Sequence, residues 1–336
     1  MNTPVYKLRG LVPSAQRAAD YIDRRASGAT APAGFQGAAP LGLGATATDW
    51  LTLLKPRVLT LVVFTGAIGL ILAPVHMNPV IALAAILCIT VAAGAAGAIN
   101  MWYDRDIDAI MRRTATRPIP AGRISAPGAL AFGVILAILS VLVMAIATNY
   151  IAATLLAVSI GFYVFIYTMW LKRSTPQNIV IGGAAGAFPP VIGWAAATGS
   201  VSALPILLFA IIFFWTPPHF WALSLYASGD YERAGVPMLP VVKGQRHTRV
   251  AIMVYTLIME PVTLAPFVLG LTGRFYGISA LLLGSLFTAY SWRVLHDKQD
   301  AAGASLTKNA PAKACFKYSI LYLFLLFGAC AIDRLI

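Results

Sequence analysis

The sequence predicts an all-α polytopic membrane protein with nine transmembrane helices, and two observations carry that prediction. The first is composition: 59% of the 336 residues are hydrophobic, 11% are charged, and the mean hydropathy is +0.78. A soluble domain carries about a quarter of its residues as charged side chains, so a soluble enzyme is excluded. The second is the length of the apolar runs, which leaves no soluble module to carry a basic, nucleic-acid-binding surface despite the net charge of +13.

Nine segments are apolar over the ~20 residues that a helix needs to cross a bilayer. They lie approximately at 51–74, 78–100, 128–147, 149–170, 177–198, 203–226, 250–272, 276–295 and 317–334. Four connections are very short, near 74–79, 148–149, 199–202 and 272–276. We therefore expect the helices on either side of each to form antiparallel hairpins, with longer polar loops at the opposite membrane face.

The basic residues are distributed unequally between the two faces. Of the 25 Lys and Arg residues, 23 lie in the N-terminal segment or the long loops, and only Arg274 and Arg334 fall on the other side. The positive-inside rule then places the N-terminus and the long loops in the cytoplasm and the C-terminus outside. We expect residues 50–336 to form the transmembrane domain and residues 1–49 a disordered cytoplasmic tail, although the Arg-rich composition of that tail also fits an organellar transit peptide.

Three polar side chains share one face at the cytoplasmic end of the second span. Asn100, Asp104 and Asp108 follow one another about 40° apart around a continuing helix, whereas Asp106 points away. Carboxylates at i, i+4 repel, so a cation is expected to hold them together. Two carboxylates and an amide oxygen, with no Cys or His beside them, favour Mg²⁺.

A group of arginines follows these acids directly. Arg112, Arg113, Arg117 and Arg123 lie in the same loop, and arginine binds phosphate oxygens through paired N–H groups. Acids followed by arginines indicate a magnesium diphosphate site. The alternative is an ordinary polar loop that obeys the positive-inside rule.

A second acid-bearing loop, 227–249, contains Asp230 and Tyr231 and follows the sixth span. It has the same local topology as the first loop, the pattern expected of two half-repeats whose loops meet over one cavity. Between them, the end of the fourth span adds two aromatic and two basic side chains on the same side: Tyr163, Tyr167, Lys172 and Arg173.

These motifs resemble the UbiA superfamily of intramembrane prenyltransferases over roughly residues 50–334. The motif shared with the whole superfamily is Asn100-x3-Asp104-x3-Asp108, extended to Arg117-Pro-Ile-Pro-Ala-Gly122. Two further stretches resemble its haem-directed branch: Trp215-x-Pro-Pro-His219-Phe-Trp221 and Asp230-Tyr-x-x-Ala-Gly-Val-Pro-Met-Leu-Pro240. Quinone-directed relatives carry two spaced aspartates where this chain has only Asp230, so this acid either binds a second metal or orients a basic residue.

The resemblance implies a helical bundle with a central cavity open to the cytoplasmic side. It implies transfer of a farnesyl group from farnesyl diphosphate to the vinyl group of haem B, giving haem O and diphosphate. Asn100, Asp104 and Asp108 would bind Mg²⁺ and act with Asp230 as catalytic residues. Diphosphate would be bound by basic residues, namely Arg57, Arg112, Arg113, Arg117, Lys172 and Arg173. Aromatic side chains and a histidine would line the haem and farnesyl cavity, namely Tyr163, Tyr167, Trp215, His219, Trp221 and Tyr231.

The resemblance also implies a bacterial inner membrane location, or a mitochondrial inner membrane as the alternative, and haem A synthase or oxidase assembly factors as partners. His219 has two interpretations: haem contact, including axial ligation, or a hydrogen-bonded histidine in a proline-broken helix. Glu260, the one acid well inside the apolar spans, is either functional or a neutral hydrogen-bonded side chain. Alternative functions are prenyl transfer to a quinone precursor or a chlorophyll-type ring, and membrane transport.

Overall fold

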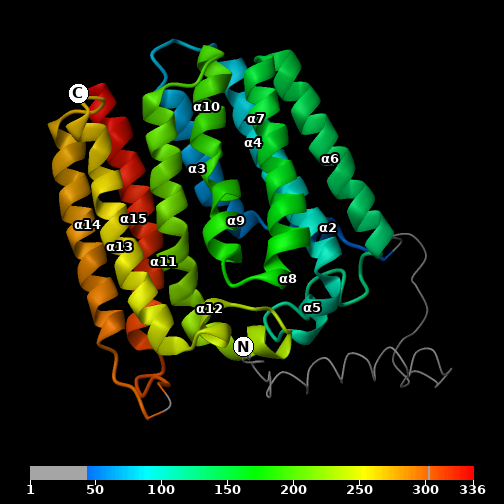
Figure 1. The fold of residues 1–336 in the computed structure, drawn as a ribbon. Coiled ribbons are helices and arrows are strands. Elements are labelled where there is room, and N and C mark those ends of the chain that lie inside the picture. The colour runs from blue at the N-terminus through cyan, green and yellow to red at the C-terminus, as the bar shows by residue number, and fades with distance from the viewer. Residues whose placement is uncertain (1–43, 302) are drawn as a thin grey trace, which may run out of the picture. The chain divides into compact units, whose positions relative to one another are not determined.

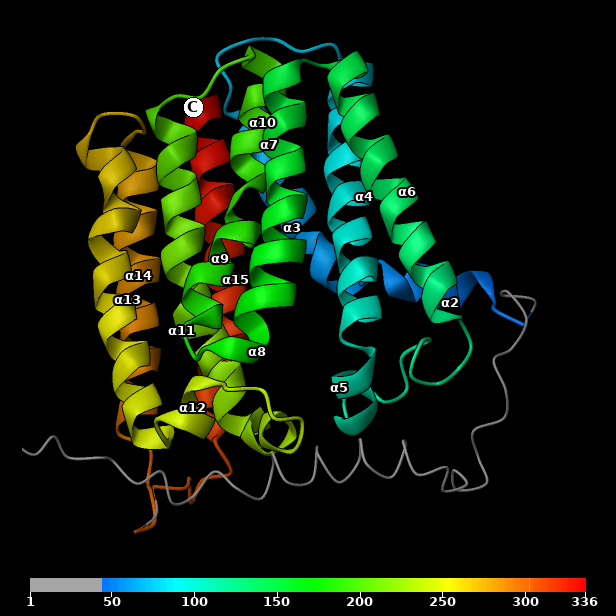
Figure 2. The ribbon, with the colours of Figure 1, turned by 45° about the vertical axis from the view of Figure 1, so that its right-hand side comes forward.

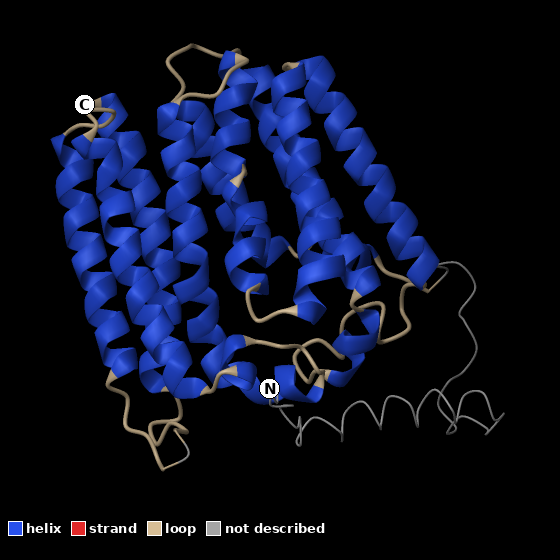
Figure 3. Cartoon of the chain, in the orientation of Figure 1, coloured by secondary structure: helices blue, strands red, loops and turns tan. Residues whose placement is uncertain are grey.

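The structure, a computed structural model, describes residues 44–301 and 303–336, and in this part of the chain all regular elements are helices (Figure 1; Figure 3). Residues 1–43 of the predicted tail 1–49 lie outside the described residues. The N-terminal helices are α2 (Ala47–Leu53), α3 (Pro56–Ile71), α4 (Pro79–Tyr103), α5 (Arg105–Ile110), α6 (Ala126–Ala147) and α7 (Tyr150–Gly161). A π-helix, η1 (Phe162–Leu171), leads into α8 (Lys172–Ser174), α9 (Asn178–Ala187) and α10 (Pro189–Thr198). The remaining helices are α11 (Ala203–Arg233), α12 (Leu239–Val242), α13 (Gln245–Val268), α14 (Arg274–Leu295) and α15 (Ala310–Leu335).

Eight helical segments of the described chain are long and apolar enough to cross a membrane, and the count is nine if α2 and α3 form one broken span. The chain is therefore an integral membrane protein. The prediction of a continuous first span over 51–74 is wrong, because the helix ends at Leu53 and restarts at Pro56. Proline has no N–H and is favoured in the first turn of a helix, which is where Pro56 lies.

The four predicted hairpin turns lie together at one end of the bundle, and the long polar loops lie together at the other end (Figure 1; Figure 2). Asparagine caps two of the helices that begin at the hairpin end, with Asn78 before α4 and Asn149 before α7. Asn149 also donates to the carbonyls of Ala195 and Ala196 at the end of α10, at 2.8 and 3.2 Å. The hairpin topology is confirmed, whereas the side on which each end lies stays a prediction.

The fourth span changes its helical period where it approaches the polar end. Helix α7 continues into η1, and a π-helix has a wider turn than an α-helix. The side chains of Thr168 and Lys172, four residues apart, both reach the end of α4, at Asn100 and Asp104. The predicted α-helical continuation to residue 170 is replaced by this π-helix.

Helix α3 packs very close to α10 in the core. A Cβ atom added at Gly69 would overlap the backbone carbonyl of Pro190, and one added at Gly193 would overlap the carbonyl of Gly66. Small residues that let helix backbones touch are the usual basis of close packing in membranes. Helices α3 and α10 thus cross in direct contact, and this crossing helps to fix the broken first span beside α4.

Candidate active site

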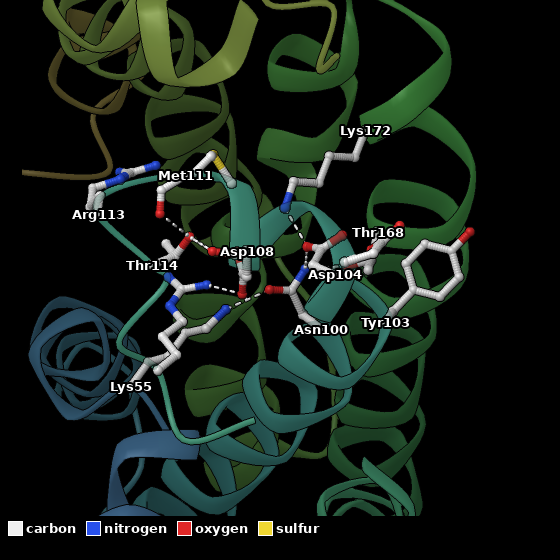
Figure 4. A network of polar contacts seen from close by, with 12 residues as sticks. Lys55, Asn100, Tyr103, Asp104, Asp108, Met111, Arg113, Thr114, Thr168 and Lys172 are labelled. Atoms are coloured by element: carbon white, nitrogen blue, oxygen red, sulfur yellow. Dashed lines mark hydrogen bonds and ion pairs between the residues drawn. The ribbon is translucent and has the colours of Figure 1, made fainter. Parts of the chain in front are cut away.

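The stripe of Asn100, Asp104 and Asp108 lies at the polar end of the bundle, where α4 gives way to α5 (Figure 4). The helical path continues through the junction, since the Asp104 amide donates to the Asn100 carbonyl (2.9 Å) and the Asp108 amide to the Asp104 carbonyl (2.8 Å). All three side chains are buried, with Asp104 at 0% and Asp108 at 1% exposure, whereas the Asp106 side chain is 60% exposed. The structure therefore brings together the three residues that the spacing groups, and turns Asp106 outward.

Each buried carboxylate is paired with basic side chains from elsewhere in the chain. Asp104 accepts from Lys172, and Arg173 lies 3.4 Å from its other oxygen. Asp108 accepts from Arg117 at 2.6 Å. Because a buried charge is costly unless it is paired, these cations make the burial of both acids possible.

Two residues that the sequence analysis did not select complete this network. The Lys55 ammonium, at the break between α2 and α3, donates to the Oδ1 atom of Asn100 at 2.6 Å. The Nδ2 atom of Asn100 donates to Asp104 (2.8 Å) and to the hydroxyl of Thr168 (3.1 Å). Lys55 and Arg57 are both basic residues at the start of span 1, and this pattern could have indicated Lys55. The sequence analysis predicted Arg57 as a diphosphate ligand instead, and the side chain of Arg57 lies outside the described residues.

Arg173 joins the buried and exposed acids. It donates to both oxygens of Asp106 at 2.7 Å, and its guanidinium lies over the Tyr103 ring, 4.8 Å from the centroid. Burial alone would raise the pKa of Asp106, but the hydrogen bonds from Arg173 and from the backbone hold the pKa of that carboxyl below its ordinary value. Arg123 is diverted from the site, because it pairs with Asp49 of α2 at 2.7 Å.

The first and second acid-bearing loops are in contact. Arg113 donates to the Tyr231 hydroxyl at 3.0 Å, and its guanidinium lies 5.5 Å from the centroid of that ring. An apolar cluster beneath them joins both loops and α9: Ile107, Met111, Ile179, Tyr231, Val236 and Met238. Arg112 and Arg113 are both exposed.

Asp230 differs in its surroundings from Asp104. Helix α11 extends to Arg233, so the prediction of a loop from residue 227 is wrong and Asp230 occupies the last turn of a helix. Its carboxylate pairs with Arg233, three residues on, which is itself 47% exposed. The Asp230 side chain is 19% exposed, and this local ion pair does not link it to α4.

Two tyrosines of η1 lie beside the acid stripe. The Tyr163 and Tyr167 rings are 5.4 Å apart, and Tyr163 packs against Ala96 and Ile99 of α4, next to Asn100. Tyr167 also lies directly over Gly182 of α9, where a Cβ atom would overlap its ring. The absence of a side chain at Gly182 therefore lets Tyr167 pack between η1 and α9.

The aromatic residues of α11 divide into two groups. His219 is stacked between Trp215 (ring centroids 4.3 Å) and Phe316 of α15 (4.6 Å), and its Nδ1 atom lies 2.6 Å from the Ser319 hydroxyl. Trp221 instead packs edge-on against Tyr255 of α13. The structure thus places Trp221 apart from Trp215 and His219.

The donor set of the stripe suits Mg²⁺. In the described residues no three His, Cys, Asp or Glu side chains are grouped so as to hold a metal. Asn100, Asp104 and Asp108 offer two carboxylates and an amide oxygen, and Mg²⁺ is commonly held by one or two carboxylates while substrate phosphates complete its shell. The surrounding cations, Lys55, Arg117, Lys172 and Arg173, outnumber the two buried acids, so the site attracts an anion.

Comparison with known proteins identifies the class. The sequence matches the UbiA prenyltransferase family over residues 62–321. It is 72% identical to a protein of Acidiphilium cryptum named protoheme IX farnesyltransferase, covering 88% of this chain and 93% of that one, and 65% identical to one of Granulibacter bethesdensis with the same name, covering 87% and 92%. Among solved structures, a UbiA homologue from Archaeoglobus fulgidus bound to GPP and Mg²⁺ has the same fold, with a TM-score of 0.57 at 19% identity over 84% of this chain and 99% of that one.

The chain therefore belongs to the UbiA prenyltransferase family and is a membrane-embedded prenyltransferase. The family resemblance predicted from the motifs is confirmed, and the transporter alternative is not supported. The structures of the Archaeoglobus fulgidus homologue include one bound to GPP and Mg²⁺ and one bound to DMAPP and Mg²⁺. The central cavity implied by the resemblance stays a prediction.

Proposed function

We propose that this enzyme transfers the farnesyl group of farnesyl diphosphate to a vinyl group of haem B, giving haem O and diphosphate. The observation that carries the proposal is the buried pair Asp104 and Asp108 within a ring of basic side chains, beside the aromatic pair of η1. The names of the 72% and 65% identical relatives support farnesyl and haem as the two substrates.

The residues at the polar end of the bundle assist the departure of diphosphate. Asn100, Asp104 and Asp108 would hold Mg²⁺, which supplies Lewis-acid stabilisation to the leaving phosphate oxygens. Lys172, Arg117 and Arg173 reach the same place from two other segments and stabilise the negative charge that develops on the leaving group. Arg113 donates to Tyr231 and so joins the first loop to the end of α11 beside this site.

The farnesyl carbon that loses diphosphate carries a developing allylic positive charge. Tyr163 and Tyr167 present adjacent aromatic rings next to the acid stripe, and the faces of aromatic rings attract cations. Their position within a membrane-embedded bundle also keeps water away from the cation until the acceptor has attacked.

Haem B supplies the nucleophile through a vinyl double bond. Its π electrons form the new carbon–carbon bond as the carbon–oxygen bond to diphosphate breaks, and a water molecule then adds to the resulting cation and loses a proton. No general base is needed for the bond-forming step. We assign Trp215 and His219 to the porphyrin side of the site, where the imidazole is stacked between Trp215 and Phe316 and Ser319 fixes its orientation by engaging Nδ1.

The location and orientation of the chain in the membrane follow from its apolar spans and from the distribution of its basic residues. The chain lies in a bacterial inner membrane, with its long loops and the diphosphate site on the cytoplasmic side, where 23 of the 25 basic residues fall. Haem O is a substrate for further haem modification, so a haem A synthase or an oxidase assembly factor is the expected recipient.

The test is product formation in isolated membranes. Membranes that contain the chain are incubated with haem B, farnesyl diphosphate and Mg²⁺, and haem O is sought by mass spectrometry. We expect haem O from the native chain and from Glu232→Gln, which removes an exposed acid on the same side, and none from Asp108→Asn. Prenylation of a hydroxybenzoate or a chlorophyll-type ring without haem O would refute the acceptor, and full activity of Asp108→Asn would refute the metal site.

A further inference from the structure

Each of the three candidate metal ligands is occupied by a basic side chain of the protein itself. Lys55 donates to Asn100 and Lys172 to Asp104 (Figure 4), and Arg117 donates to Asp108. Lys172 and Arg117 neutralise buried carboxylates. Lys55 is different, because its hydrogen-bond partner is a neutral amide, so charge neutralisation at Asn100 does not explain its position.

The backbone at Lys55 is held in an unusual conformation. Lys55 has φ +55° and ψ +54°, a left-handed conformation that is unfavourable for a non-glycine residue and unusual before a proline. It ends the break between α2 and α3, and its side chain runs over Gly97 of α4, where an added Cβ atom would lie 3.4 Å from Lys55 Cδ. The break and the bare glycine surface together direct the ammonium to Asn100.

The hydrogen bond occupies the one atom of Asn100 that can bind a metal. Nδ2 is a donor and is used by Asp104 and Thr168, so Oδ1 is the only acceptor of this side chain. The Lys55 Nζ atom lies 2.6 Å from it, within the space that a metal ion at Oδ1 would need. An ammonium and a divalent cation cannot both occupy this position.

We propose that Lys55 is an internal counter-cation that competes with the metal for Asn100 and moves to diphosphate when the substrate binds. This inference rests on the proposed function, because it requires the magnesium diphosphate site. Diphosphate offers the ammonium a charged partner in place of a neutral amide, and a hydrogen bond to a charged partner is the stronger one. Metal and diphosphate consequently bind together, and neither ligand alone fills the site tightly.

Of these three cations, Lys55 is the one whose removal should destabilise the protein least. Loss of Lys172 or Arg117 leaves a buried carboxylate without its partner, which is strongly destabilising. Loss of Lys55 leaves an amide oxygen, at the smaller cost of an unsatisfied neutral acceptor. The variants Lys55→Met and Lys55→Gln both remove the charge, and Lys55→Gln keeps a hydrogen-bond donor in case the apolar variant does not fold.

The experiment measures binding of Mn²⁺, a paramagnetic substitute for Mg²⁺, to the purified full chain in detergent, with and without inorganic diphosphate. For the native protein we expect diphosphate to tighten Mn²⁺ binding about tenfold or more. For Lys55→Met and Lys55→Gln we expect Mn²⁺ alone to bind about tenfold more tightly than to the native protein, and the enhancement by diphosphate to shrink. Lys55→Arg, which keeps the charge, and Lys243→Met, which removes an exposed lysine of the same end, should resemble the native protein.

Two outcomes separate failure of this inference from failure of the proposed site. If Asp104→Asn abolishes Mn²⁺ binding but both neutral Lys55 variants bind Mn²⁺ alone no more tightly than the native chain, the counter-cation role is refuted and the metal site stands. If Asp104→Asn binds Mn²⁺ as the native chain does, the metal site itself is refuted, and the role of Lys55 with it.

Discussion

The two acid-bearing stretches, Asp104 after α4 and Asp230 in the last turn of α11, each lie at the end of the second helix of a hairpin but have different surroundings. Asp104 is fully buried and is held by Lys172 and Arg173, residues about seventy positions away in sequence. Asp230 is partly exposed and pairs with Arg233 on its own helical turn.

The difference shows that a repeated topology does not imply repeated chemistry. The fold buries Asp104 by bringing cations to it from distant parts of the sequence. The same network of cations can bind a highly charged ligand. Asp230 needed only a local partner and stays available to move. We infer that the first half binds the metal and the leaving group, whereas the second half contributes an adjustable side chain beside the Arg113–Tyr231 contact.

The largest effect is expected for Asp104→Asn, the substitution that removes the centre of the buried network. We expect a loss of haem O synthesis of about 10³-fold, the order of the loss when preorganised charge stabilisation is removed. The melting temperature should also fall, because Lys172 is left without its carboxylate. Activity of purified enzyme and thermal unfolding in detergent measure the two effects.

A second variant separates chemistry from stability. Asp104→Asn combined with Lys172→Met removes both members of the ion pair and should recover part of the lost melting temperature without recovering activity. Recovery of activity in the double variant would mean that Asp104 serves only to neutralise Lys172, and the contrast between the two halves would then lose its functional meaning.

Asp230→Asn is expected to have an intermediate effect. The substitution leaves Arg233 in an exposed position where water can solvate it, so stability should change little. We expect activity to fall roughly 10- to 100-fold, as for residues that support a metal or phosphate site from outside its ligand set. Glu232→Gln, two residues away and exposed, is the matched control. A loss as large as that of Asp104→Asn would show that the two acids are equivalent.

The sequence sufficed for the features that depend on local spacing. The i, i+4 spacing of Asn100, Asp104 and Asp108 predicted their common face, and the backbone hydrogen bonds through Asp104 explain why: the helical path does not stop there. The hairpin turns and the polar end followed from the apolar runs and the basic residues. The stretch Ser228-Gly229-Asp230, in contrast, is typical of a turn, yet tertiary packing keeps α11 helical to Arg233.

Features set by packing could not be predicted in this way. The left-handed Lys55 contradicts the extended backbone expected before proline, and depends on the close approach of α4 at Gly97. The π-helix was also missed, because Tyr163 and Tyr167 are four residues apart and fit an α-helix equally well. Both features bring Lys55 and Thr168 to Asn100, so the unpredicted part of the site is the part assembled from distant segments.

A smaller effect is expected for Tyr231→Phe, which tests the contact between the two halves. Phenylalanine keeps the packing and the aromatic face but loses the hydroxyl that accepts from Arg113 at 3.0 Å. We expect the KM for farnesyl diphosphate to rise about fivefold, the equivalent of one hydrogen bond, with kcat changed less than twofold. Tyr226→Phe, on the same helix, is the control. An unchanged KM would show that this contact between the halves does not help to bind diphosphate.

The smallest effect is expected for Asp106→Asn, which contrasts an exposed acid with its buried neighbours. The Asp106 side chain is 60% exposed, so its pair with Arg173 is screened by water and activity should fall about twofold at most. Because the folded protein holds the pKa of Asp106 below its ordinary value of 3.8, the pair stabilises the fold above that pH, and this stabilisation is lost as the pH falls through the lower folded value. The melting temperatures of the native chain and Asp106→Asn should therefore differ slightly and constantly from pH 5 to 7, and converge when the pH drops below about 4. A difference that persists at low pH would show that Asp106 acts through packing and not through its charge.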